Sequence, residues 1–386
     1  MHITLADPRG FADAARGIAK LLASGPIDPV LAGIVLHAEP GGLTLSGFDR
    51  ETATCITLDD TVEVETPGRV LVSGRLLGEI ARLLPRQTTT LVTDDRQLTI
   101  VAGGSRATLP LLPIDDYPAL PETPDVIGEV DAADFAAVAG RVASAAGTDE
   151  ALPGLTGLGI DLPDSGEPLR LYATDRRRMA TATLTWQPAL GPALRARVLV
   201  PARPVTDAAT LLASRGGTIR IGLDPDHRRL GLASDHRRIT LAVLDVPAPP
   251  YDRVLATSPG SSFTAPVGEL AAAVKRLALH REHPGMDITL ADNTLRMEIT
   301  SSAGTTVDTL AVDYTATPVH ARLNTSLVAA ALHALDSDLV HITLPRTANA
   351  APKPWTLRPL TSTGPDDQLR YLVMPMTIPA QTAAAA

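Results

Sequence analysis

Residues that could carry chemistry are few in this sequence, and their spacing forms no catalytic motif. The 386 residues include nine histidines and one cysteine. His280 and His283 lie close together, but no carboxylate or cysteine pattern completes a zinc site around them. The sequence has no Walker phosphate loop, dinucleotide glycine fingerprint or paired-histidine metal motif. No nucleophile–base pair can be assigned from spacing, so we expect a non-catalytic protein without cofactor or metal, with its histidines at helix ends or on the surface.

Three other groups that could be reactive or bind a ligand have structural explanations. Cys55 lies in the strand-like run 54–58, and we expect a small buried hydrophobe there. Gly103-Gly104-Ser105 is expected to form a hairpin turn between strands. Asp175 precedes three arginines, but an aspartate that follows a strand is usually a turn residue. An enzyme that assembles catalytic groups from separate repeated domains remains an alternative.

The elements that would position functional groups occur three times along the chain. A β-branched strand runs into an amphipathic helix at 69–84 and at 197–212, and a fainter copy covers 320–335, where Asn324 or Thr325 would cap the helix. The remaining elements of each unit are an earlier helix (11–22, 133–145 and 267–279), a strand segment (42–50, 168–176 and 293–300) and closing alternating strands (97–110, 229–246 and 355–376).

This order predicts an α+β fold of three repeated domains, each with two helices packed on antiparallel sheets. The period of roughly 120–130 residues is too long for a solenoid unit. We expect domains at 1–122, 127–248 and 251–378, followed by a disordered tail at 379–386. The proline-rich joints at 113–124 and 246–251 are expected to be stiff connectors.

The composition restricts the possible partners. The net charge is −9, so any DNA contact must come from locally clustered basic residues. Aromatic residues make up only 3%, which argues against a protein that stacks single-stranded bases on rings. No apolar run of about 20 residues is present, and the N-terminus lacks the features of a signal peptide. With a single cysteine, the chain is expected to be cytoplasmic and without a membrane partner.

Six short stretches, in the correct order, carry a resemblance over about residues 1–378. They are Asp116–Pro118, Leu155–Gly157, Ala173–Ala180, Val200–Arg203, Tyr251–Leu255 and Tyr371–Met376. Together they resemble the bacterial DNA polymerase III beta subunit, the sliding clamp. The resemblance implies three DNA-clamp domains and a head-to-tail homodimer that forms a ring of pseudo-six-fold symmetry, with helices lining the hole.

The resemblance also implies a function and its partners. A sliding clamp encircles double-stranded DNA without reading its sequence and tethers the replicative polymerase as a processivity factor in DNA replication. The clamp loader and other proteins with a clamp-binding motif would be further partners, and the protein would associate with the nucleoid during replication. A ring needs only weak, salt-sensitive phosphate contacts, because it cannot leave the duplex sideways.

Two sets of residues follow from the resemblance. A pocket for partner peptides needs apolar anchor sites and adaptable side chains. The matching positions are Leu155, Thr174, Arg176, Arg177, Arg178, Met179, Pro249, Arg253, Val254, Leu372, Met374, Pro375 and Met376. The basic residues expected to face DNA are Arg16, Lys20, Arg75, Arg82, Arg141, Arg203, Lys275 and Arg276.

The sequence departs from the family pattern at several points. Arg176 puts bulk and charge where the family often has a small residue, Met179 replaces the usual leucine, and Thr377 stands where many relatives have arginine. The helix expected at 327–335 has no lysine or arginine. These departures leave two alternatives open. One is an auxiliary clamp paralogue with altered partner or inhibitor binding, for example resistance to a clamp-targeting antibiotic. The other is a peptide-binding scaffold that no longer encircles DNA.

Overall fold

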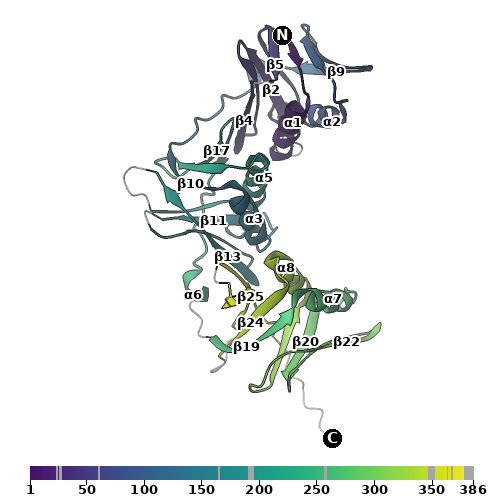
Figure 1. Ribbon diagram of the computed structural model, residues 1–386, viewed down its shortest axis with the longest axis vertical. Coiled ribbons are helices and arrows are strands. Elements are labelled where there is room, and N and C mark those ends of the chain that lie inside the picture. Colours follow the sequence, from purple (N-terminus) through teal and green to yellow (C-terminus); the bar gives the residue numbers. More distant parts are fainter. Residues whose placement is uncertain are drawn as a thin grey trace.

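The computed structural model of the chain is shown in Figure 1. It describes residues 1–22, 25, 28–59, 61–163, 166–189, 195–255, 259–346, 353–362, 364–366 and 368–377. Across these ranges, no helix has the length and apolar character needed to span a membrane. The tail expected to be disordered at 379–386 lies outside the described residues.

The first repeat is built from two helices and a run of antiparallel strands. Its elements are β1 (His2–Leu5), α1 (Arg9–Leu21), a 3-10 turn (Pro29–Ala32), β2 (Gly33–Glu39), β3 (Gly42–Phe48), β4 (Thr52–Leu58), β5 (Val62–Thr66), β6 (Gly68–Ser73), α2 (Gly74–Leu83), β7 (Thr89–Thr93), β8 (Gln97–Ala102), β9 (Ser105–Leu112) and a second 3-10 turn (Ile114–Asp116). Helix α1 buries Phe11, Ala14 and Ile18, which are spaced to lie on one helical face. Helix α2 packs closely on α1 because Gly78 has no side chain there: an added Cβ would lie 3.2 Å from the Cβ of Ala19.

The second and third repeats follow the same order. The second contains β10 (Val126–Asp131), α3 (Ala132–Ala143), α4 (Pro153–Thr156), β11 (Gly157–Leu162), β12 (Leu169–Thr174), β13 (Arg178–Leu184), β14 (Gln187–Pro188), β15 (Ala196–Pro201), α5 (Ala202–Ala213), β16 (Thr218–Leu223), β17 (Arg229–Ser234) and β18 (Arg237–Ala242). After α6 (Asp252–Leu255), the third contains β19 (Pro259–Pro266), α7 (Val267–Leu277), β20 (Gly285–Ala291), β21 (Thr294–Ser301), β22 (Gly304–Ala311), β23 (Val319–Asn324), α8 (Thr325–Leu335), β24 (Leu339–Pro345), β25 (Trp355–Thr361), β26 (Gly364–Pro365) and β27 (Leu369–Val373).

The six longer helices form one continuous row. Contacts run in the order α2, α1, α5, α3, α8 and α7. The three repeats follow an arc in Figure 1, and these helices lie along its inner side with the sheets outside. At the first junction, Gly17 of α1 meets α5 so closely that an added Cβ would lie 2.5 Å from Cδ1 of Leu211.

Strand pairing also joins neighbouring repeats. Strand β18 of the second repeat pairs with β4 of the first, in a sheet of 14 strands. Strand β13 of the second repeat pairs with β27 of the third, in a sheet of nine strands. Because backbone hydrogen bonds cross both junctions, each repeat is held to the next by sheet pairing as well as by helix contacts.

The predicted α+β architecture of three similar units is confirmed, and so are several local predictions. The hairpin turn expected at Gly103-Gly104-Ser105 joins β8 to β9, with Ala102 paired to Ser105. Asn324 caps α8, since its side-chain oxygen accepts hydrogen bonds from the amides of Ser326 and Leu327. The helix expected at 11–22 runs from Arg9 to Leu21, so its first two residues were missed.

The prediction of a buried Cys55 is wrong. The side chain is half-buried. Along β4 the core residues are Ile56 and Leu58, so strand alternation directs Cys55 to the opposite face of the sheet. There Nη2 of Arg238 on β18 lies 3.7 Å from its Sγ.

The joint at 113–124 is more than the expected connector. Tyr117 is buried among Val35, Phe48 and Leu71. Its hydroxyl accepts a hydrogen bond of 2.5 Å from the amide of Phe48, and burial raises its pKa to about 12. This part of the joint therefore belongs to the packed first repeat.

Candidate functional site

A largely apolar cavity lies at the junction of the second and third repeats. Its volume is about 600 Å³. Arg176 and Arg178 are the charged residues of its lining among the described part of the chain. The lining residues are Ala151, Leu152, Pro153, Gly154, Leu155, Thr174, Arg176, Arg178, Met179, Val246, Pro247, Pro249, Pro250, Tyr251, Val254, Pro354, Leu372 and Met374. A cavity of this size and character suits the apolar side chains of a short peptide.

Five segments that are distant in sequence build this cavity, one of which contributes only Pro354, just before β25. The segment around α4 supplies Leu155, the β12–β13 hairpin supplies Met179, and β27 supplies Leu372. Strand pairing brings the last two together, because Met179 lies opposite Leu372 in the β13–β27 ladder. The connector before α6 supplies Tyr251, which is packed with Met179 and Leu372 in one buried cluster.

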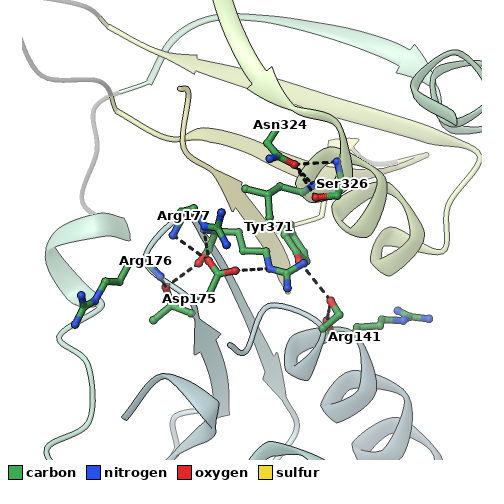
Figure 2. Close-up of polar contacts among 11 residues, drawn as sticks. Arg141, Asp175, Arg176, Arg177, Asn324, Ser326 and Tyr371 are labelled. Atoms are coloured by element: carbon green, nitrogen blue, oxygen red, sulfur yellow. Dashed lines mark hydrogen bonds and ion pairs between the residues drawn. The ribbon is translucent and has the colours of Figure 1, made fainter. Parts of the chain in front are cut away.

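The turn between β12 and β13 shapes one rim of the cavity. Asp175 accepts hydrogen bonds of 2.9 Å from the amides of Arg177 and Arg178 and pairs at 3.0 Å with Nε of Arg178. Asp175 is thus the turn residue that its position predicted. Arg176 has a left-handed backbone with φ 73°, and its side chain points away from the Asp175 network in Figure 2. The rim therefore presents one neutralised arginine and one exposed arginine.

The C-terminal strand is anchored to the same turn. The amide of Met374 donates a 2.8 Å hydrogen bond to the carbonyl of Arg177. Tyr371 is buried beneath the turn, where its hydroxyl lies 3.5 Å from Oγ of Ser144 (Figure 2). Burial raises the pKa of Tyr371, so its hydroxyl stays neutral at physiological pH.

The wall formed by the connector is also neutral and hydrogen-bonded. Tyr251 is buried, and its hydroxyl donates to the Asp161 carboxylate. Burial, followed by the hydrogen bond to Asp161, raises the pKa of Tyr251 to about 12. The Tyr251 hydroxyl therefore remains protonated, and a donor, across the physiological pH range.

The structure brings most of the predicted pocket residues together. The predicted residues that line the cavity are Leu155, Thr174, Arg176, Arg178, Met179, Pro249, Val254, Leu372 and Met374. Arg177, Pro375 and Met376 are outside the lining: Arg177 is exposed, and Met376 forms a bridge with Arg322 of β23. The side chain of Arg253 lies outside the described residues.

Half of the lining was missed from the sequence. The additional residues are Ala151, Leu152, Pro153, Gly154, Val246, Pro247, Pro250, Tyr251 and Pro354. The prolines at 247 and 250 were assigned to a connector, and only the folded chain shows that this connector is also a wall. Pro354 has no sequence signal that would have placed it there.

The eight basic residues expected to face DNA all lie on helices α1, α2, α3, α5 and α7 of the inner row. Several are neutralised by carboxylates. Lys20 pairs with Asp207 at 2.8 Å, and Arg276 makes a two-pronged contact with Asp308. The other ion pairs are Arg16 with Asp13, Arg82 with Glu79, Arg141 with Asp336 and Arg203 with Asp207. Arg75 and Lys275 are exposed.

Comparisons with known proteins agree with this architecture. The model of the DNA polymerase III beta subunit, N-terminal domain, matches residues 1–121, and that of the central domain matches residues 129–249. The beta sliding clamp of Streptomyces coelicolor is 33% identical over 381 residues, covering 95% of this chain and 97% of that protein. The beta sliding clamp homolog GriR of Streptomyces muensis is 36% identical over 262 residues, covering 68% of this chain and 69% of that protein.

A solved structure shows the same fold. The sliding clamp of Pseudomonas aeruginosa, crystallised bound to griselimycin, has a TM-score of 0.85 at 23% identity and covers 98% of this chain and 100% of that chain. The family models together match more than half of the chain, in the order in which the first two repeats occur. The chain therefore belongs to the family of bacterial DNA polymerase III beta subunits, the sliding clamps of DNA replication.

Proposed function

We propose that this sliding clamp closes as a head-to-tail homodimer around double-stranded DNA and holds its partners through the cavity between the second and third repeats. The observation that carries the proposal is that cavity, which is open, mostly apolar and rimmed by arginine. The partners would be the replicative polymerase, the clamp loader and other proteins with an apolar clamp-binding motif. The protein would act in the cytoplasm at the nucleoid, as a non-catalytic processivity factor.

Open strand edges at the two ends of the arc support ring closure. Residues 105–110 of β9 pair with β8 on one side, and β22 is the outer strand of its four-stranded sheet, within the described residues. Unpaired backbone groups on such edges favour pairing with another chain. If β9 of one chain pairs with β22 of its partner, two identical heterologous contacts close the ring.

Exposed apolar side chains lie near both of these edges. Leu83 on α2 is 71% exposed, and Leu279 just after α7 is 77% exposed. Helices α2 and α7 are the two ends of the helical row. In the proposed ring, the α2 end of one chain would therefore cover the α7 end of its partner. Val307 on β22 is also exposed, at 44%.

The inner row of helices supports the DNA-binding part of the proposal. Basic side chains lie on five of its helices, whereas the whole chain has a net charge of −9. Phosphates would therefore be attracted mainly to the inner surface. Because many of these cations are already paired with carboxylates, the attraction is weak, which suits a ring that slides.

The experiment that tests the pocket is peptide binding. A fluorescent peptide with an apolar clamp-binding motif should bind the wild-type dimer with micromolar affinity. The double variant Leu155→Ala and Met374→Ala should weaken binding by roughly 2–4 kcal/mol, because both anchor surfaces are lost. Val126→Ala, which removes an exposed apolar side chain on β10, is the matched control. No binding by a dimeric wild type would refute the pocket assignment.

A second candidate is an auxiliary clamp with altered inhibitor binding. Arg176 favours it, because this long, exposed side chain stands at the rim of the cavity where an inhibitor or partner must enter. The likeness to a clamp homolog, GriR, over two thirds of the chain is compatible with this candidate. An auxiliary clamp would have the same fold and the same pocket. It would differ only in which peptides or inhibitors can pass the rim and bind.

A further inference from the structure

A polar network outside the cavity holds the connector wall in place. Asp161 on β11 and Arg197 on β15 are cross-strand partners. Arg197 donates to both carboxylate oxygens of Asp161, through Nε at 2.7 Å and Nη2 at 3.0 Å. Tyr251 joins this pair from the connector: its hydroxyl donates to Asp161 and accepts from Nη2 of Arg197 at 3.2 Å. Two-pronged arginine–carboxylate pairs fix direction as well as distance.

Aromatic contacts complete the network. The guanidinium carbon of Arg197 lies 4.6 Å from the centroid of the Tyr251 ring, within cation–π range. The ring of Tyr172 lies 4.3 Å from that of Tyr251, centroid to centroid. Tyr172 itself lies over Gly159, where an added Cβ would come within 2.1 Å of the ring. Arg197 also lies 5.9 Å from the centroid of the Tyr172 ring, so Tyr251, Tyr172 and Arg197 form one mutually contacting cluster.

Tyr251 connects this network to the wall of the cavity. It lines the cavity itself, and its carbonyl accepts hydrogen bonds from the amides of Val254 at 2.9 Å and Leu255 at 3.2 Å. Val254 is a second lining residue on the same wall. A four-residue helix such as α6 has no stability of its own, so its position depends on tertiary contacts. Arg197 also lies 3.5 Å from Asp252, the first residue of α6.

We propose that Asp161 and Arg197, which do not line the cavity, are positioning residues that set its affinity for partner peptides by preordering the Tyr251–Val254 wall. This inference rests on the proposed function of the cavity. A site whose binding-competent wall is populated only part of the time binds with an affinity reduced by that fraction. Loss of the network therefore weakens peptide binding without removing any contact to the peptide.

Three variants test the role of the network in the full chain. Asp161→Asn removes the charge but keeps the shape, Arg197→Met removes the guanidinium but keeps the stem, and Tyr251→Phe removes only the hydroxyl. Each variant should weaken binding of the fluorescent peptide by about tenfold. This is the loss expected if the wall is ordered in only about a tenth of the molecules. Arg195→Met is the matched control, because Arg195 precedes the same strand and pairs with Glu167 at 3.4 Å.

Two readouts separate positioning from a general loss of stability. Amide hydrogen exchange should accelerate at Val254 and Leu255, while the amides of the β12–β13 ladder stay protected. In the Tyr251→Phe background, Asp161→Asn should cause little further loss, because both changes act on the same hydrogen bond between Tyr251 and residue 161. Additive losses, or a lower melting temperature with unchanged peptide affinity and exchange, would overturn the inference.

The wild type distinguishes failure of the inference from failure of the function. If the wild type binds and all three network variants bind equally well, the cavity is a peptide site but the network does not position it. If the dimeric wild type does not bind at all, the proposed function of the cavity fails, and the inference fails with it.

Discussion

Arg176 has a left-handed backbone conformation that residues other than glycine rarely adopt. Its φ is 73°, and its amide donates a 3.1 Å hydrogen bond to Oγ1 of Thr174, which helps to hold the turn. Among the residues that the structure describes, the Arg176 side chain forms no ion pair, and it extends from the rim (Figure 2). At this residue, backbone strain is combined with bulk at the mouth of the cavity, which is a pattern found at functional positions.

The variant Arg176→Gly should therefore change both stability and binding. Relief of the left-handed strain should raise the stability by at most about 1 kcal/mol. Removal of a side chain that must be ordered or displaced should tighten binding of the peptide by roughly 0.5–1.5 kcal/mol. Calorimetric titration measures the affinity of each protein for the peptide. Arg177→Ala, which removes an exposed arginine outside the lining, is the control; equal effects of the two variants would remove the support for the auxiliary-clamp candidate.

At the scale of elements, helix α8 packs against helices of two different repeats. It packs on α7 within the third repeat and on α3 across the junction, and it has no lysine or arginine. Leu327, Val328 and Ala331 are buried against neighbouring elements, which accounts for their apolar character. Ser326, Ala329 and His333 are exposed, so the solvent-facing positions of α8 also lack lysine and arginine.

The N-cap of α8 should contribute measurably to stability. The Asn324 side chain accepts hydrogen bonds from the amides of Ser326 at 3.0 Å and Leu327 at 3.2 Å. Figure 2 shows Asn324 beside Ser326 at the start of the helix. Asn324→Ala should lower the stability by about 1 kcal/mol, because two helix amides lose their acceptor. Asn324→Asp keeps the acceptor and should stay within a few tenths of a kcal/mol of the wild type. Urea unfolding measures the difference, and equal midpoints for all three proteins would contradict it.

At the scale of the whole molecule, the arc has two unlike ends. One end presents the open part of β9 and the exposed Leu83, and the other presents β22 with the exposed Val307. Lys20 with Asp207 and Arg141 with Asp336 bridge the two internal junctions, so the helices on either side of each junction are also tied by charge. An arc with fixed internal junctions has one defined curvature, which two copies need in order to close.

Val307→Lys should open the proposed ring. Light scattering should give the wild type twice the 40.4 kDa of one chain and the variant a single chain mass, because a charge on an edge strand opposes pairing. The wild type, loaded by a clamp loader, should remain on nicked circular plasmid and leave after linearisation, whereas the variant should not be retained. Val126→Lys is the control, because Val126 lies on β10 of the second repeat, away from both ends of the arc, and pairs with Gly222 of β16. A monomeric wild type that is still retained would rule out this ring.

Much of the fold could be predicted from sequence because its determinants are local. Apolar spacing identified the long helices, alternation identified the strands, and turn chemistry identified Asp175 and Gly103-Gly104. The prediction for Cys55 failed because a strand has two faces, and the run 54–58 does not show which face meets the core. The first two residues of α1 were missed because Arg9 and Gly10 are polar or small and do not extend the apolar pattern.

The sequence by itself determined the three-fold α+β repeat, the family resemblance and about half of the cavity lining. Only the tertiary structure decided that the joint at 246–251 is a wall of the cavity, that Asp161 and Arg197 hold it, and which basic residues are neutralised. The physical reason is how far apart along the chain the interacting residues lie. Periodicity and capping act between neighbours along the chain, whereas the cavity and the ion pairs join residues separated by one or two repeats, and those meetings depend on how the sheets pair across the junctions.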